Sequence, residues 1–429
     1  MSSASHQEPR VLERSEHNIS RQNIPETTLK VLSRLHASGK KAYLVGGAVR
    51  DLLLGRQPKD FDVGTDARPG EIRRIFRNSR IIGRRFRLAH VFFPEGIVEV
   101  ATFRREPSEE DQEGAQDELL ITSDNTYGTP REDAFRRDFT INALFYSIAD
   151  FSVIDYVGGI DDLDDGLIRV IGDPEVRFRE DPVRMVRAVE FAARLKFDLE
   201  PATAEGIVRT RSEIAKASPA RMTEELVQLL RCGHAGDALQ LMLDLGLVDE
   251  LLPEVYDMVA ADERGLGKFN RIPLVFDELV EEVREVSDGA LLAALLLPKV
   301  LLHRYDAEAA AGQPMSPGAL STLVAEVAEP LVTRFVLSRT RAERIGGSLE
   351  TFLRLCEPDW QPEGRRRFAL RKDFDDALVL LEVVTRATGE GGEVLAGWSE
   401  AARDRPEPRS ETPPGRGRPR RRRRRRPRR

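Results

Sequence analysis

Hydrophobic residues recur at a helical spacing near the start of the chain. Three leucines at intervals of three residues follow Pro25, and the pattern ends at Gly39, whose missing Cβ suits the C-terminus of a helix. A short apolar run over residues 42–45 then predicts a buried strand, and two glycines separate it from a short helix predicted over residues 48–54. The chain therefore opens as helix, strand, glycine turn and helix.

More strands and one more helix are predicted further along. The strands are expected over residues 60–64, 80–83, 88–93 and 97–103. The helix is expected over residues 69–78, where the apolar residues Ile72, Ile75 and Phe76 fall on one face. An acidic stretch over residues 106–118 interrupts the pattern and is expected to be a flexible loop. The first 150 residues thus predict an α/β or α+β domain.

The pattern becomes helical after a strand predicted over residues 152–157. Asp181 and Pro182 predict a helix start, because the aspartate can serve as N-cap and proline suits the first helical position; this helix should reach Leu195. From there to Thr388 the chain is rich in Leu, Ala, Glu and Arg and shows no repeat of fixed period. We expect a flexible N-terminal extension (residues 1–24), a mixed-sheet head (25–172), a helical neck (173–260), a helical body (261–400) and a disordered tail (401–429).

Length and composition agree with a multidomain protein of the cytoplasm. The 429 residues are enough for two or three domains. The longest apolar run, Ala290–Leu297, is far shorter than the roughly 18 residues that a membrane-spanning helix needs, and the N-terminus lacks the apolar segment of a signal peptide. Two cysteines argue against a disulfide framework or a cysteine metal site. We therefore expect a cytoplasmic protein with no membrane partner.

Charge is divided unevenly along the chain. The net charge is −6, yet residues 416–429 hold 11 arginines and no acid, so the preceding residues carry a net charge of −17. Such a run cannot bury apolar surface and should stay disordered. Because arginine pairs with phosphate oxygens, the tail predicts binding to a nucleic acid, although a solubilising or targeting tail has the same composition. The candidate nucleic-acid-binding residues are Arg416, Arg418, Arg420, Arg421, Arg422, Arg423, Arg424, Arg425, Arg426, Arg428 and Arg429.

Two aspartates stand at the predicted start of a strand. Side chains alternate along a strand, so Asp60 and Asp62 should point the same way while Phe61 points into the core. Two carboxylates at that spacing can share Mg²⁺ ions with the phosphates of a nucleotide, as in nucleotidyl-transfer sites that hold two ions. A solvated acidic strand end produces the same pattern by chance. The residues around the pair therefore decide between a metal site and a solvated strand end.

The setting is a glycine turn after a buried strand. Gly46 and Gly47 have no side chains, so backbone N–H groups there can approach a triphosphate, and Arg50 on the following helix can pair with phosphate oxygens. A tight turn alone would also explain the glycines. Together with the aspartates, the turn predicts a nucleotide site with bound Mg²⁺.

A third carboxylate would help to activate the attacking hydroxyl group. Glu99 lies between two valines on a predicted strand, where it could face the aspartates; a solvated glutamate is the alternative. Asp138 is the other candidate, because it stands with Arg137 and Asn142 at the start of an apolar run. Helix capping would explain Asp138 but not Arg136 and Arg137 beside it. The residues leave this choice open.

The helix predicted from Asp181 carries charged side chains on one face. Arg184 and Arg187 are three residues apart, and Glu180 and Asp181 stand at the helix start. Such a face offers donors and acceptors that can bind a nucleotide base. An ordinary salt-bridged, exposed face is the alternative, and the spacing alone favours it.

Four segments, in this order, resemble the motifs of a known family. They are Leu44–Asp51 (LVGGAVRD), Lys59–Asp62 (KDFD), Arg136–Leu144 (RRDFTINAL) and Glu180–Arg187 (EDPVRMVR). Together they resemble the ordered motifs of the class II nucleotidyltransferases, which include the tRNA CCA-adding enzymes and the bacterial poly(A) polymerases. Four motifs in order are far more specific than any one of them.

The resemblance implies a fold class, a reaction and roles for these residues. It implies an α+β, polymerase-β-like head followed by an all-α neck and body, and Mg²⁺-dependent transfer of a nucleoside monophosphate from an NTP to an RNA 3′-hydroxyl without a template. By motif position, Asp60 and Asp62 match the pair that binds two Mg²⁺ ions. The nucleotide-binding candidates are Gly46, Gly47, Arg50, Arg137 and Asn142, with Asp181, Arg184 and Arg187 on the nucleotide-reading helix.

Three features resemble the poly(A) polymerases more than the CCA-adding enzymes. They are the block over residues 80–91 with its continuation over 99–104, the extension over residues 1–41, and the basic tail. The resemblance therefore implies addition of AMP from ATP to RNA 3′ ends. We expect RNA-decay or RNA-chaperone proteins as further partners, and a monomer is favoured although the sequence leaves the oligomeric state open. A CCA-adding tRNA nucleotidyltransferase is the alternative enzyme. A non-catalytic RNA-binding protein is the alternative from another class, and the intact carboxylate pair argues against it.

Overall fold

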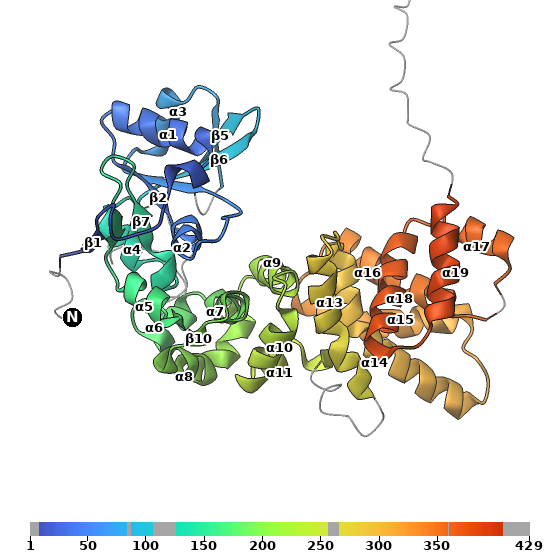
Figure 1. Ribbon diagram of the computed structural model, residues 1–429. Coiled ribbons are helices and arrows are strands. Elements are labelled where there is room, and N and C mark those ends of the chain that lie inside the picture. Colours follow the sequence, from blue (N-terminus) through green and yellow to red (C-terminus); the bar gives the residue numbers. More distant parts are fainter. Residues whose placement is uncertain (1–7, 84–86, 106–125, 256–265, 359, 406–429) are drawn as a thin grey trace, which may run out of the picture.

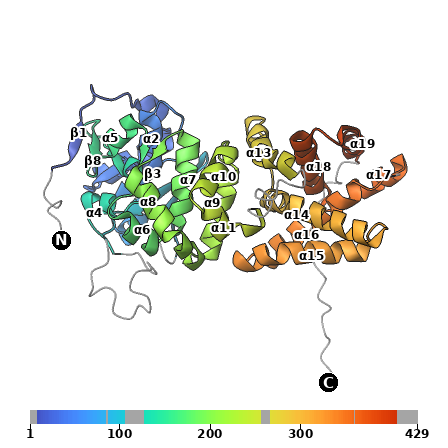
Figure 2. The same ribbon diagram turned by 90° about the horizontal axis from the view of Figure 1, so that it is seen from below.

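A head, a neck and a body follow one another along an elongated, bent molecule (Figure 1), and the view from below shows the same order (Figure 2). The computed structural model describes residues 8–83, 87–105, 126–255, 266–358 and 360–405. The acidic loop expected over residues 106–118 and the arginine tail lie outside the described residues.

The head is built on a mixed sheet of eight strands. In chain order they are β1 (Arg10–Leu12), β2 (Ala42–Val45), β3 (Asp62–Thr65), β4 (Ser79–Ile82), β5 (Leu88–Phe93), β6 (Gly96–Thr102), β7 (Leu144–Tyr146) and β8 (Val153–Asp155). Across the sheet the order is β1-β8-β7-β2-β3-β6-β5-β4. Strands β3 and β6 are parallel, and the other neighbours are antiparallel. The glycine turn after β2 and the aspartates at the start of β3 are therefore central in the sheet.

The two faces of the sheet are covered differently. The helices of the head are α1 (Glu26–Ala37), α2 (Gly47–Leu53), α3 (Pro69–Ile75), α4 (Pro130–Phe135) and α5 (Gly159–Asp165). On one face, alternate side chains such as Val91 and Val100 are buried in a cluster with apolar residues of α1 and α3. On the other face, a cluster that includes Phe103, Ala134 and Phe145 covers β7, β2 and β3. The side chains that β5 and β6 present on this second face are accessible to solvent.

The second half of the N-terminal extension is part of the head. Strand β1 pairs with β8, and Ile19 and Ile24 are buried with 1% and 4% exposure. The His17 side chain lies 2.8 Å from the carbonyl oxygen of Phe151. The expectation of a flexible extension is therefore wrong for residues 10–24, because a few apolar side chains without any period anchor this polar segment to the sheet.

The neck is a set of short helices. They are α6 (Pro174–Glu180), α7 (Val183–Leu195), α8 (Pro201–Thr210), α9 (Pro219–Leu230), α10 (Ala235–Asp244) and α11 (Leu247–Leu251). A small parallel pair, β9 (Leu167–Ile168) with β10 (Asp198–Leu199), joins the end of the head to this otherwise helical region. Asp181 does not cap α7 as expected; it follows α6 as its C-cap, which leaves its carboxylate free for other contacts.

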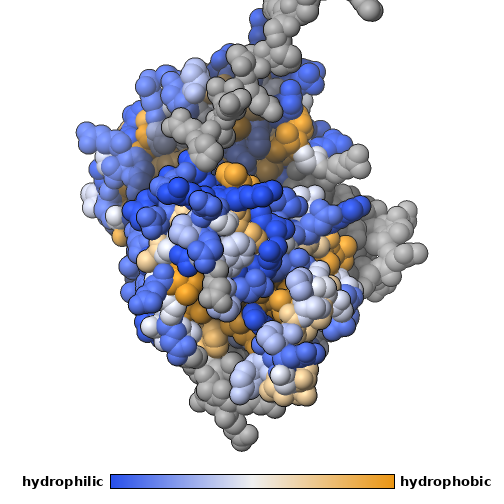
Figure 3. Space-filling model, turned by 90° about the vertical axis from the view of Figure 1, so that its right-hand side faces the viewer, coloured by the Kyte–Doolittle hydropathy of each residue, from blue (hydrophilic) through white to orange (hydrophobic). Residues whose placement is uncertain are grey.

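The body is helical throughout its described part. Its helices are α13 (Ile272–Glu281), α14 (Asp288–Ala311), α15 (Pro317–Arg334), α16 (Arg339–Leu355), α17 (Pro362–Phe368), α18 (Phe374–Thr388) and α19 (Gly392–Arg403). The end of the molecule formed by the body shows a mainly hydrophilic surface with smaller apolar patches (Figure 3). Among the described residues, none of the helices combines the length and the apolar character that crossing a membrane requires. The prediction of an α+β head followed by helical regions is confirmed.

Candidate active site

The turn between β2 and α2 requires glycine at Gly46, and at Gly47 it brings an arginine into ordinary contact distance. Gly46 has φ 72° and ψ −138°, a conformation that residues with a Cβ rarely adopt. A Cβ on Gly46 would also lie 2.9 Å from Nη1 of Arg137. A Cβ on Gly47 would lie 3.4 Å from Nη2 of Arg50. The turn is thus the point where two arginine side chains pack against bare backbone.

Three acidic side chains gather next to this turn. Asp62 is the first residue of β3 and lies opposite Val45, the last residue of β2. Strands β3 and β6 are parallel with Val63 paired to Val100, so the preceding residues, Asp62 and Glu99, lie side by side and point to the same face. Asp60 lies just before the strand, which begins two residues later than predicted.

The charges that act on Asp62 agree with this placement. The carboxyl of Asp62 is accessible to solvent, yet the surrounding protein partly desolvates it. This desolvation, with the negative charges of Glu99 and Asp60, raises the pKa of Asp62 from 3.8 to about 6, although Arg137 opposes the rise. Crowded carboxylates of this kind are stabilised by a bound cation.

The donor set fits Mg²⁺ when a nucleotide is also present. In the part of the chain that the structure describes, no group of three His, Cys, Asp or Glu side chains is close enough to hold a metal ion alone. Mg²⁺ is usually bound by one or two carboxylates together with substrate phosphates. Asp60 and Asp62 supply such a pair, with Glu99 beside it.

Arg137 connects the turn to the acidic group. Its guanidinium donates to Asp133 at 3.0 Å and to the carbonyl oxygen of Asn142 at 3.1 Å, and it lies over the ring of Phe145. Its charge acts on Asp62, and its Nη1 lies against Gly46. The structure therefore brings Arg137 together with Gly46 and Asp62, as the motif pattern predicts.

Arg50 has a different environment from the one expected. It is 3% exposed, pairs with Asp51 at 2.8 Å and donates to Oδ1 of Asn142. The ring of Phe191, from α7, lies 5.1 Å from the guanidinium. Its donors are directed to acceptors inside the protein, and it joins α2 to the neck; contact of Arg50 with a triphosphate stays a prediction. Asn142 is likewise buried, at 7% exposure.

The carboxylate of Asp138 is bound by an arginine of the neck. Both Nε and Nη2 of Arg187 donate to its Oδ2, at 2.9 and 2.7 Å, and Asn142 and the backbone N–H of Phe139 donate to its Oδ1. Burial alone would raise the pKa of Asp138, but Arg187 and these hydrogen bonds lower it from 3.8 to about 2. Arg187 also pairs with Glu225 of α9 at 3.2 Å. Asp138 thus joins head and neck, and Glu99 is the carboxylate beside Asp62.

The candidates at the start of α7 are held by ion pairs. Asp181 accepts from Arg221 of α9 at 2.8 Å. Arg184 is 6% exposed and donates to the carbonyl oxygen of Arg177 at 2.8 Å and to Glu180 at 3.2 Å. The alternative of an ordinary exposed face is therefore wrong for Arg184.

The sequence left the role of Arg136 unexplained, and two further charged residues around this site were missed. Arg136 is surrounded by other arginines, and desolvation together with their charges lowers its pKa to about 9; these neighbours are Arg104, Arg137, Arg177 and Arg184. Arg221 and Glu225 were missed because they lie on α9, about 40 residues from their partners. Their spacing of four residues on one helix is the signal that could have suggested a shared face.

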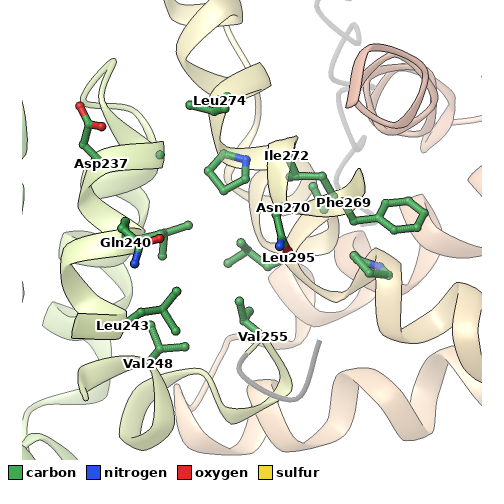
Figure 4. A pocket seen from close by; sticks show the side chains of 15 residues that line it. Asp237, Gln240, Leu243, Val248, Val255, Phe269, Asn270, Ile272, Leu274 and Leu295 are labelled. Atoms are coloured by element: carbon green, nitrogen blue, oxygen red, sulfur yellow. The ribbon is translucent and has the colours of Figure 1, made fainter. Parts of the chain in front are cut away.

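Among the hollows that the described residues form, two lie beside the neck and body. A groove of about 750 Å³ is lined by Lys59, next to Asp60, and by residues of the neck and body that include Arg231, Arg284 and Arg344. An apolar pocket of about 290 Å³ lies between α10, α11 and α13, where Leu243, Val248 and Leu295 point into it (Figure 4). None of the site residues predicted from the sequence lines this apolar pocket.

Two protein families match separate parts of the chain. The poly A polymerase head domain matches residues 42–169, which include the glycine turn, the three carboxylates and Arg137. The family described as the probable RNA and SrmB-binding site of polymerase A matches residues 196–258, which include α9.

Curated relatives and solved structures agree with these matches. The chain is 52% identical over 249 residues to poly(A) polymerase I of Salmonella typhimurium, covering 57% of this chain and 54% of that protein. It is 40% identical over 223 residues to the CCA-adding enzyme of Bacillus velezensis, covering 52% and 54%. The Bacillus stearothermophilus CCA-adding enzyme in complex with CTP superimposes with a TM-score of 0.63 at 27% identity, covering 90% of this chain and 82% of that one.

The head thus defines the class of the protein as a nucleotidyltransferase fold with an acidic centre beside a glycine turn. The chain is thus similar, over its head and neck, to the poly(A) polymerases and to the CCA-adding enzymes. Its matches span about half the length of the curated relatives.

Proposed function

We propose that the protein adds AMP from ATP to RNA 3′ ends without a template, as a poly(A) polymerase. The observation that carries this proposal is the placement of Asp60, Asp62 and Glu99 beside the Gly46–Gly47 turn. This placement occurs in a head whose curated relatives at 44–52% identity are poly(A) polymerases I.

Different residues of the chain have different roles in the proposed reaction. The RNA 3′-oxygen forms a bond to the α-phosphorus of ATP, the bond to the bridging oxygen breaks, and pyrophosphate leaves. Arg137 would contact the triphosphate beside the turn, and Glu99 would face the 3′-hydroxyl next to Asp62. Asp60 and Asp62 would hold Mg²⁺, which when bound supplies positive charge beside the phosphates and lowers the pKa of the hydroxyl. Positioning and charge compensation account for most of the acceleration in phosphoryl chemistry.

Base selection is proposed for the junction of α6 and α7. Asp181 offers an acceptor and Arg184 a donor, and both are oriented by neighbouring charges. The groove lined by Lys59 and the neck and body arginines would take the RNA strand, whose phosphates would compete for these arginines with their carboxylate partners Asp288, Glu382 and Asp376. The tail from Arg416 to Arg429 would add electrostatic attraction, and a cytoplasmic location belongs to the same proposal.

The test is an extension assay with the full chain. A 5′-labelled oligoadenylate is incubated with Mg²⁺ and either ATP or CTP, and the products are separated by length. We expect a long adenosine ladder with ATP and little extension with CTP. Asp60→Asn or Asp62→Asn should remove the ladder, while the control Asp165→Asn, an exposed acid at the end of α5, should retain it.

The same assay distinguishes the second candidate function. CCA addition is favoured by the fold comparison with the CTP complex described above. A tRNA lacking its CCA end is therefore offered with CTP and ATP. Addition that stops after one to three residues would replace the poly(A) proposal by CCA addition. Absence of any Mg²⁺-dependent pyrophosphate release would leave an RNA-binding protein without catalysis.

A further inference from the structure

Strands β5 and β6 present an unusual set of side chains on the accessible face of the sheet. These are Leu88, His90 and Phe92 on β5, and Ile97, Glu99 and Ala101 on β6. A strand that buries one face usually carries polar side chains on the other. Here the buried face is already apolar, yet Phe92 and Ile97 on the opposite face are also apolar and are 41% and 53% exposed.

The register of the sheet connects these residues to the candidate active site. Phe92 lies directly opposite Ile97, and His90 lies directly opposite Glu99. Glu99 in turn lies beside Asp62 on β3. The pair of Phe92 and Ile97 is thus two residues along the strands from the row of charged groups, a separation of roughly 7 Å.

Local contacts fix the arrangement of this surface. Nε2 of His90 lies 2.9 Å from Oε1 of Glu99. The rings of His90 and Phe92 meet edge to face, with their centroids 6.4 Å apart. On the next strand Arg80 is exposed and lies opposite His90, so a positive charge borders the surface. We call His90, Phe92 and Ile97 the β5–β6 platform.

We propose that the β5–β6 platform binds the unpaired 3′-terminal nucleotides of the RNA, with one base stacked on Phe92. This proposal rests on the proposed function and specifies where the RNA end lies. Exposed aromatic rings bind single-stranded RNA irrespective of its sequence, because every base has a flat face. Arg80 supplies a charge for the phosphates, and Glu99 lies on the neighbouring strand, two residues along from the position opposite Phe92.

An RNA end fits this surface better than a second copy of the chain does. A stable protein interface buries roughly 800 Å² on each partner. Phe92 and Ile97 form one cross-strand pair, which is far too small for that purpose but matches a single base. The platform also continues directly into the carboxylates, where the RNA 3′-hydroxyl has to arrive.

The test compares Phe92→Leu, which keeps an apolar side chain, with Phe92→Tyr, which keeps the ring. Tyr305→Leu is the control, because Tyr305 is an aromatic residue with 72% exposure on body helix α14. Steady-state extension of oligoadenylate is measured for the full-length proteins. Stacking on one aromatic side chain predicts a KM for the primer that rises roughly 5- to 150-fold in Phe92→Leu. The KM for ATP and the values for Phe92→Tyr and Tyr305→Leu should stay within about twofold of wild type.

A binding measurement gives a readout that does not depend on catalysis. A primer with 2-aminopurine as its last base is mixed with each protein in the absence of ATP and Mg²⁺. We expect the fluorescence to be quenched by wild type and by Phe92→Tyr, and to remain high with Phe92→Leu.

The outcomes separate this proposal from the proposed function. An active wild type together with an unchanged primer KM in Phe92→Leu would overturn the platform alone. A Phe92→Leu variant that dissociates a wild-type dimer, measured by light scattering, would also overturn it in favour of a contact between copies. If wild type adds no AMP, the proposed function fails, and quenching that persists in Phe92→Leu would overturn the platform as well.

Discussion

The ion pair between Asp138 and Arg187 should contribute measurably to the stability of the head and neck. The two side chains are 15% and 31% exposed, and they join segments 49 residues apart in the sequence. Arg187 and three hydrogen bonds lower the pKa of Asp138 from 3.8 to about 2 even though burial would raise it. A shift of this size corresponds to about 2 kcal/mol of stabilisation at neutral pH.

Arg187→Gln should therefore destabilise the protein by about 2–3 kcal/mol, because it leaves a desolvated carboxylate without its cation. For a unit of 150–250 residues this lowers Tm by about 4–12 °C. The sign of the pH dependence follows from the two folded-state pKa values. In wild type the folded pKa is below the unfolded one, so the stabilisation is present above pH 3.8 and is lost as the pH falls through about 2.

In Arg187→Gln the largest remaining influence on Asp138 is burial, which raises its folded pKa above 3.8. The resulting loss of folding free energy is complete at neutral pH, where Asp138 is ionised, and it disappears as the pH falls toward 3.8. The difference in Tm between wild type and variant should therefore be larger at pH 7.5 than at pH 4.5.

Thermal unfolding followed by far-UV circular dichroism measures this difference. Both tryptophans, Trp360 and Trp398, lie in the body, so fluorescence reports separately on that region. The control is Arg339→Gln, because Arg339 is 92% exposed and its partner Glu343 is 52% exposed. Adding Asp138→Asn to Arg187→Gln should recover part of the lost stability. A Tm change of less than about 1 °C, or one that is equal at both pH values, would refute the reasoning.

Three further outcomes follow from the site. Gly46→Ala should destabilise the protein by about 1–3 kcal/mol and reduce AMP addition, because φ is 72° and a Cβ would meet Arg137; Gly70→Ala, with no atom near its Cβ, is the control in the same thermal and extension assays. The Mg²⁺ concentration for half-maximal activity should rise as the pH falls through about 6, because Asp62 is then protonated; an equal requirement at pH 5.5 and 7.5 would contradict this. Arg221→Gln should lower the preference for ATP over CTP by about tenfold, since a charge-assisted hydrogen bond at the α6–α7 junction is lost, and competition between the two nucleotides measures it.

The elements with regular periodicity could be predicted from the sequence. Strand β5 spans residues 88–93 as predicted, because buried and accessible side chains alternate along it. Strand β7 was missed, since Leu144–Tyr146 is only three residues long and buried on both faces, which leaves no alternation to detect. The buried anchors Ile19 and Ile24 were missed because two isolated apolar residues in a polar segment have no period.

The candidate site was predictable where its geometry is local. The glycine turn and the aspartates lie on adjacent strands, so the motif order was enough to place Gly46 with Asp62. Glu99 could be proposed from the sequence only because it is an acidic residue between two valines. Its position beside Asp62 follows from the parallel register of β3 and β6, which the sequence does not give. The burial of Arg50 could not be predicted, because its partner Asn142 is 92 residues away.

Helix α9 connects the residues proposed to select the nucleotide base with the segment that matches the polymerase A RNA-binding family. Arg221 and Glu225 are one turn apart on α9, and they pair with Asp181 and Arg187, respectively. Arg187 also binds Asp138 of the head. One face of α9 therefore holds both Asp181, which precedes α7, and Arg187, which lies within α7. The two pairs formed by α9 are partly buried, and displacing α9 would separate Asp181 from Arg221 and Arg187 from Glu225. Any movement of this helix would therefore change the positions of Asp181 and Arg187, two of the side chains proposed to bind the nucleotide.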